Sequence, residues 1–124
     1  MYQRFEIIGR VVAAPEMKYT PDATPIHAVT NFTVAVNEKF GGRENTVWVR
    51  VATWNGLAEV CNKYVTKGML IFVEGRINVD GSGNPRTFQR KDGTAGASLE
   101  MTASTVKFLS KGERVESADL DVPF

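Results

Sequence analysis

Two tryptophans and an arginine alternate with valines between residues 46 and 54. Side chains of a β-strand point alternately to its two faces, so Val47, Val49 and Val51 are predicted to share one face. The opposite face would carry Trp48, Arg50 and Trp54. Valines suit a barrel interior, whereas indoles flanking a guanidinium suit stacking on planar groups and contact with anions. This pattern favours a surface for single-stranded nucleic acid. The alternative is that a helix or a second subunit covers the tryptophans.

Further cations and aromatic rings fall in predicted loops and at outward strand positions. They are Arg4, Arg10, Lys18, Phe40, Arg43, Arg76, Arg86, Phe88, Arg90 and Lys91. A ring can stack on any base for about 1 to 3 kcal/mol, and each cation adds a salt-sensitive phosphate contact. The combination predicts binding that does not depend on base order. For any one of the cations, a solvated surface position is the competing interpretation.

The charge is distributed unevenly along a chain whose formal net charge is only +1. Residues 1–112 carry a net charge of +4, and residues 113–124 carry −3. The split indicates a basic body that meets a polyanion and an acidic end with another task.

The remaining chemistry-bearing residues do not assemble into a catalytic or metal site. His27 has no paired nucleophile, and Asp80 and Asp92 lie in turn-like contexts. Cys61 is the single cysteine, so the sequence offers neither an intramolecular disulfide nor a zinc ligand set. We expect a binding protein without catalytic residues, cofactor or metal.

The elements that must position these residues are mostly strands. Period-two alternation predicts strands over residues 4–14, 28–36, 46–54, 69–77 and 98–109. The glycine pair at 41–42 predicts a hairpin, and residues 80–96 read as a loop. Leu57, Val60, Cys61 and Tyr64 share one face of a predicted helix over 55–67, which we expect Asn55 to cap and Gly68 to end.

Five strands with one helix between the third and fourth is the order of the OB fold, an all-β, five-stranded Greek-key barrel. At 124 residues the chain has room for one such domain. It has no apolar run near the roughly 18 residues of a membrane helix. The first nine residues lack the features of a secretory signal, so export is not expected.

Several motifs in order resemble the bacterial single-stranded DNA-binding protein family. They are Phe5-Glu-Ile-Ile-Gly-Arg, Pro15-Glu-Met-Lys-Tyr-Thr-Pro, Asn31-Phe-Thr-Val-Ala-Val, Trp48-Val-Arg-Val-Ala-Thr-Trp-Asn-Gly-Leu-Ala-Glu, Tyr64-Val-Thr-Lys-Gly, Val73-Glu-Gly-Arg and Asp119-Leu-Asp-Val-Pro-Phe. The resemblance implies stacking roles for Phe40, Trp48, Trp54 and Phe88. It also implies a homotetramer in the cytoplasm, at the bacterial nucleoid, acting in DNA replication, recombination and repair.

The resemblance further divides the chain by task. Residues 1–109 would form the DNA-binding barrel, residues 110–118 a flexible linker, and residues 119–124 a disordered acidic tip that recruits replication, recombination and repair proteins. The tip residues are Asp119, Leu120, Asp121, Val122, Pro123 and Phe124. The tip is too short to fold, and it pairs an apolar ring with a free carboxylate for a partner pocket.

Three other classes compete with this interpretation. A primosome-type accessory protein would share the barrel but lack the acidic tip. An RNA-binding OB-fold module would use the same kind of stacking surface. An OB-fold nuclease would need clustered carboxylates, and the sequence offers no such cluster.

Overall fold

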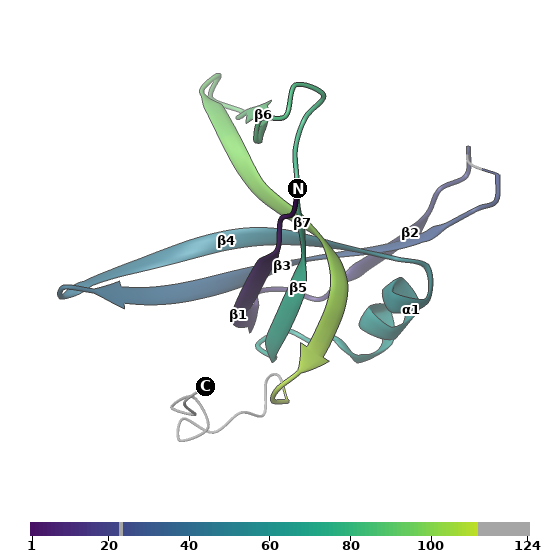
Figure 1. Cartoon of the computed structure of the whole chain (residues 1–124), viewed down its shortest axis with the longest axis horizontal. Coiled ribbons are helices and arrows are strands. Elements are labelled where there is room, and N and C mark those ends of the chain that lie inside the picture. Colours follow the sequence, from purple (N-terminus) through teal and green to yellow (C-terminus); the bar gives the residue numbers. More distant parts are fainter. Residues whose placement is uncertain (23, 112–124) are drawn as a thin grey trace.

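The computed structural model describes residues 1–22 and 24–111, and five of its strands close into a barrel. These strands are β1 (Phe5–Val11), β3 (Ala28–Phe40), β4 (Arg43–Trp54), β5 (Leu70–Asn78) and β7 (Ala95–Phe108). They follow the order β1–β5–β7–β4–β3, and pairing of β1 with β3 completes the circle (Figure 1). Only the β4–β7 pair among these is parallel. The predicted all-β, five-stranded OB barrel is confirmed.

The core side chains follow the alternation that the sequence predicted. Val49 and Val51 are fully buried and Val47 packs against them at the edge of the core. From β3, Phe32 and Val34 point into the same interior. Strands β1, β5 and β7 complete it with Ile7, Val11, Ile71, Val73, Met101 and Ala103.

Helix α1 (Asn55–Tyr64) lies between the third and fourth barrel strands, as predicted, and buries Ala58 and Cys61. The buried Thr30 hydroxyl donates a hydrogen bond to the Ala58 carbonyl at 2.6 Å, which ties the helix to β3. In the part of the chain that the structure describes, no helix has the length and apolar character to cross a membrane.

The predicted ends of this helix were wrong. Asn55 makes no side-chain cap, because its backbone is left-handed (φ 55°) and its amide contacts His27 instead. The helix ends at Tyr64 rather than near residue 67. Val65 turns extended there and is buried in the core, so packing ends the helix before Gly68 is reached.

Two short strands were missed by the sequence prediction. The expected strand over 4–14 stops at Val11, and the chain then forms a separate β2 (Glu16–Tyr19) at the edge of β3. The expected loop over 80–96 contains β6 (Arg86–Gln89), which pairs with the start of β7. All four β6 residues are exposed, so this strand has no buried face that would give a periodic apolar signal.

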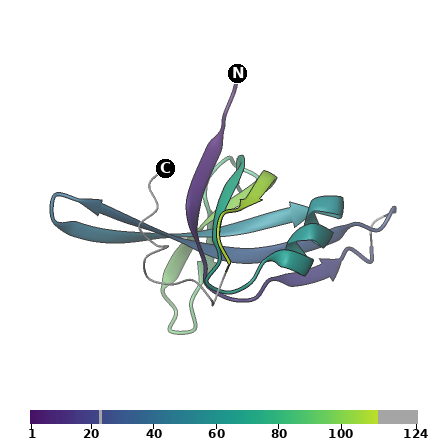
Figure 2. The ribbon, with the colours of Figure 1, turned by 90° about the horizontal axis from the view of Figure 1, so that it is seen from below.

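Strands β3 and β4 extend well beyond the barrel as a two-stranded ribbon (Figures 1 and 2). The pairing runs without a break to Phe40 and Arg43, which leaves a two-residue turn at Gly41 and Gly42. Both glycines have positive φ, as a type I′ turn requires. The predicted hairpin is confirmed.

At Gly75 the backbones of β5 and β7 approach closely. The register shifts between Glu74 and Gly75, and a Cβ atom added to Gly75 would lie 1.9 Å from the Thr102 carbonyl oxygen. No real Cβ atom tolerates such a contact. The bulge therefore needs glycine at this position.

Burial raises the pKa of the Cys61 thiol to about 11. An unfolded cysteine titrates near pH 8.5, so this thiol stabilises the fold below that pH and the contribution disappears as the pH rises through 11. We expect the free energy of unfolding, measured with urea, to fall by on the order of 2 kcal/mol between pH 8 and pH 11 for this reason. Cys61→Ala should lack this component of the pH dependence. An equally steep alkaline loss in the variant would contradict the assignment.

Candidate nucleic-acid interface

The outer face of β4 carries Trp48, Arg50 and Trp54, as the alternation predicted. Trp48 is 58% exposed and Trp54 is 42% exposed, so neither indole is buried by the described part of the chain. The two rings stand six residues apart on one strand, about 20 Å at the rise of a β-strand. Each ring is therefore available to a different base, with the guanidinium between them for a phosphate.

The neighbouring strand keeps this face open. Across from the four outward positions 48, 50, 52 and 54, β3 places Ala35, Thr33, Asn31 and Val29. These side chains are short and cannot shield the indoles. The same face of the sheet continues onto β2, where Lys18 pairs with Val29 and therefore lies on the same face as Trp54.

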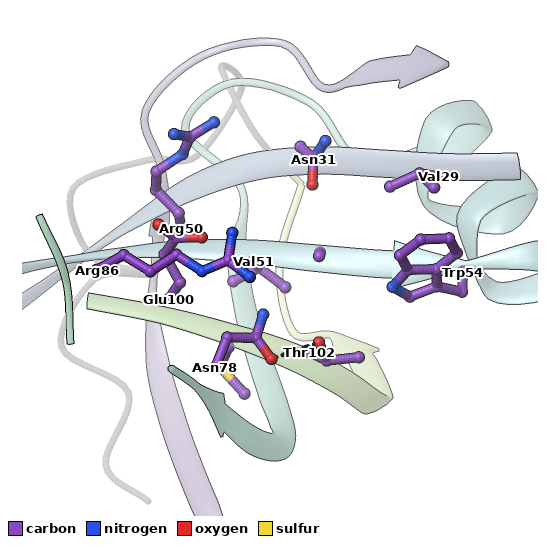
Figure 3. Close-up of a pocket in the computed structure, with 11 residues that line it drawn as sticks. Val29, Asn31, Arg50, Val51, Trp54, Asn78, Arg86, Glu100 and Thr102 are labelled. Atoms are coloured by element: carbon purple, nitrogen blue, oxygen red, sulfur yellow. Dashed lines mark hydrogen bonds between the residues drawn. The ribbon is translucent and has the colours of Figure 1, made fainter. Parts of the chain in front are cut away.

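A hollow of about 450 Å³ lies on this face between β3, β4, β5 and β7. Figure 3 shows Trp54 at one end of it and the guanidinium groups of Arg50 and Arg86 toward the other. The wall between them is polar, formed by Asn31, Asn78, Glu100 and Thr102. The Thr102 hydroxyl donates to the Asn78 amide oxygen at 2.7 Å, which leaves the Asn78 amide donors free for a ligand.

Sequence reasoning missed these four wall residues. Asn78, Glu100 and Thr102 reach the hollow only because β5 and β7 are paired in this register, with Glu100 opposite both Arg50 and Asn78. No local pattern in the sequence carries that long-range register. Asn31 could have been found, since it alternates with Phe32 and therefore points outward.

Phe88 and Arg90 form a second aromatic and cationic pair, on the hairpin of β6 and β7. Phe88 is 47% exposed, and the Arg90 guanidinium lies 5.6 Å from its ring centroid. Arg90 also donates to the Ala95 carbonyl. Arg86, on the same short strand, points back to the hollow beside Arg50 (Figure 3). The hairpin thus connects Phe88 to the face of β4.

An aspartate side chain stabilises each of the two turns that flank β6. The Asp80 carboxylate accepts hydrogen bonds from the backbone N–H groups of Ser82 and Asn84, at 2.8 and 3.0 Å. These bonds, that of Asn84 foremost, lower the pKa of Asp80. The hydroxyl and backbone N–H of Thr94 do the same for Asp92. Both carboxylates therefore serve the turns.

Phe40 stands apart from the hollow, at the tip of the β3–β4 ribbon. It is 68% exposed and pairs with Arg43 across the turn. The ribbon projects from the barrel in both views (Figures 1 and 2). By the alternation of β3, Phe40 falls on the opposite face of the ribbon from Ala35 and Trp48, so a DNA strand that reached both Phe40 and Trp54 would have to pass around the ribbon as well as along it.

Three other predicted cations lie at the margins of this surface. Arg4 pairs with Glu6 at 3.3 Å and Glu74 at 3.6 Å. Arg10 lies opposite Ala35, which itself pairs with Trp48, but its guanidinium donates to the Gly68 carbonyl at 2.8 Å. Arg76 lies opposite Thr102 and so shares the outer face of β5 with Asn78, and it lines a second hollow beside Met1, Tyr2 and Gln3. The predicted tip residues 119–124 and most of the linker lie outside the described residues.

The chain is similar to one known protein family and to several named proteins. It matches the "Single-strand binding protein family" over residues 2–109. It is 36% identical to "Single-stranded DNA-binding protein 2" of Clostridium acetobutylicum, over 94% of this chain and 85% of the relative. It is also 36% identical to a "Single-stranded DNA-binding protein" of Clostridium tetani (92% and 74% covered), and 34% identical to one of Neisseria meningitidis serogroup A (83% and 57%). With the barrel, the open tryptophan face and a match over nearly the whole chain in agreement, this chain belongs to the single-strand binding protein family.

Proposed function

We propose that this protein binds single-stranded DNA without regard to base order and protects it during replication, recombination and repair. The observation that carries the proposal is the face of β4, where two exposed indoles flank Arg50 on a strand whose other face is core. Unpaired bases stack on the rings of Trp48 and Trp54, and phosphates contact the cations. The family match and the names of the relatives support DNA as the ligand. The protein acts by binding, without a catalytic step.

The remaining predicted residues extend this surface in two directions. Lys18 continues the row of Trp54 across β3 onto β2. Arg86, Phe88 and Arg90 extend it onto the β6–β7 hairpin. Phe40 offers a further ring at the ribbon tip. Arg4 and Arg10 are the members of the predicted set with the least support as DNA contacts, because both already have protein partners. Arg76 shares the outer face of β5 with Asn78 and could extend the surface there.

Two further features of the proposal come from the family resemblance. The protein is a homotetramer, in which several barrels hold one strand, and it works in the bacterial cytoplasm at the nucleoid. Residues 1–109 are the DNA-binding domain, 110–118 the linker and 119–124 the partner-binding tip.

The test of DNA binding is a competition of equal-length oligo-dT, single-stranded RNA and duplex DNA. We expect single-stranded DNA to bind most tightly, because duplex bases are unavailable for stacking. The log of the affinity should fall linearly with the log of the salt concentration, by about 0.7 per phosphate contact. Preference for RNA would favour the RNA-binding alternative, and equal affinity for duplex would contradict the stacking surface.

The acidic tip gives a separate prediction. Deleting residues 119–124 is expected to leave oligo-dT affinity unchanged or slightly higher, because like charge keeps the tip off phosphates. The same deletion should abolish capture of replication and repair proteins in a pull-down. Asp119→Ala with Asp121→Ala, in the full-length chain, tests the charges alone. Loss of DNA binding with retained partners would contradict this division of tasks.

A further inference from the structure

The single histidine of the chain lies beside the Trp54 indole. The ring centroids of His27 and Trp54 are 6.3 Å apart with an interplanar angle of 76°, an edge-to-face arrangement. Such pairs are more favourable than burial alone would make them. Trp54 is less exposed than Trp48, but 42% of it remains accessible to a ligand.

His27 is itself held at both its backbone and its ring. Its N–H donates to the Thr20 hydroxyl at 2.9 Å, and its carbonyl accepts from the Thr20 N–H at 2.9 Å. The ring nitrogen Nδ1 lies 3.0 Å from Oδ1 of Asn55. The ring is thus fixed between the start of β3 and the residue that follows Trp54.

Asn55 occupies a backbone conformation that few side chains adopt. Its φ of 55° is left-handed, and it is the only residue other than glycine with positive φ among the described residues. Asparagine tolerates this region better than most residues, but at some cost. The cost is offset locally by the bond to His27, which replaces the helix cap that Asn55 does not make.

We propose that His27 and Asn55 are positioning residues that hold the Trp54 indole ready to stack on a base. The inference rests on the proposed function. A ring fixed before binding loses less rotamer freedom when a base stacks on it, and this preorganisation appears as affinity. Among the described residues no aromatic ring packs against Trp48, and its neighbour across the strand pair is Ala35. Under this proposal the Trp54 indole is held more firmly than the Trp48 indole.

The binding test is a double-mutant cycle between His27 and Trp54. His27→Ala is expected to weaken oligo-dT binding about 2- to 10-fold, and to have almost no further effect once Trp54 is alanine. Asn55→Gly, which keeps the backbone conformation but removes the amide, should weaken binding in the same direction. Ile26→Ala is the matched control, because that neighbouring side chain is 63% exposed and is neither of the two paired rings.

A second readout tests the contact without DNA. The Asn55 amide selects one tautomer of the neutral His27 ring, since its oxygen would require a proton on Nδ1 and its nitrogen an unprotonated Nδ1. A long-range proton–nitrogen NMR spectrum of the one histidine should show one dominant tautomer in the wild type and a more even mixture in Asn55→Gly. Thermal unfolding of the variant shows whether the fold itself has been loosened.

The outcomes separate this inference from the proposed function. If the wild type binds oligo-dT and Trp54→Ala weakens it, but His27→Ala does not, the positioning role is overturned alone. An equal loss from His27→Ala with and without Trp54 overturns it too, since His27 would then act on DNA directly. A wild-type tautomer mixture that Asn55→Gly leaves unchanged overturns it whatever the DNA result. Failure of the wild type to bind single strands counts against the proposed function, and the tautomer still tests the contact.

Discussion

Replacing both Trp48 and Trp54 with alanine is expected to cost about 2 to 6 kcal/mol of single-stranded DNA binding, since each stacked ring contributes about 1 to 3 kcal/mol. The barrel should remain folded, because both indoles lie on the outer face and no core residue is removed. Fluorescence anisotropy of labelled oligo-dT gives the affinity, and thermal unfolding gives the stability.

Tyr64→Ala is the matched control for this pair. Tyr64 is also an exposed aromatic residue, but it lies on α1 beside Phe108, away from the face of β4. Its removal should leave DNA affinity unchanged. In the single variants, emission of the remaining tryptophan should fall when oligo-dT is added, because a stacked base quenches the indole. Unfolding of the double variant, or wild-type affinity in a folded one, would contradict the assigned face.

Substituting Gly75 with alanine is expected to destabilise the barrel by about 3 kcal/mol or more, a cost at the upper end of that for overpacking. The added methyl group would overlap the Thr102 carbonyl oxygen and come within 2.9 Å of the Ala103 Cα atom, and both are backbone atoms that cannot rotate away. Strands β5 and β7 would have to separate at the bulge. Urea unfolding at neutral pH measures the loss.

Gly56→Ala provides the comparison. A Cβ atom at Gly56 would meet nothing within 4 Å, and the residue lies in the first turn of α1. Alanine favours a helix over glycine by about 1 kcal/mol, so this variant should be as stable as the wild type or more stable. If both substitutions had the same effect, the close approach at Gly75 would not be the cause.

The sequence predicted the parts of the fold that have one buried face. Alternation in β3 and β4 identified Phe32, Val34, Val49 and Val51 as core and exposed the tryptophans, because a half-buried strand must alternate. It failed for β6, where no residue is buried. It also failed at Asn55, whose backbone is left-handed and whose amide contacts a residue 28 positions away in the sequence.

The site was predictable to the same extent. Residues on a single strand, such as Trp48, Arg50 and Trp54, were found from local spacing. Glu100 and Asn78 were not, because they join the hollow through strand pairing: Glu100 pairs with Arg50, 50 residues before it, and with Asn78, 22 residues before it. Arg10 was selected as a cation on an outward position, but its partner, the Gly68 carbonyl, is 58 positions away and invisible to local reasoning.

Strand β7 pairs with β4, β5 and β6, and its partners in β4 precede it by 50 residues. Contacts between distant residues slow folding, because the intervening chain must be ordered before they form. A nascent chain synthesised as far as Asn78 contains the residues of β1, β3, β4 and β5. It cannot close the barrel, because β7 lies between β5 and β4. Val49, Val51 and Ile71 remain incompletely buried until the last barrel strand leaves the ribosome. The hollow beside Trp54 needs Glu100 and Thr102 from that strand, so the last barrel strand completes both the barrel and the proposed DNA-binding surface.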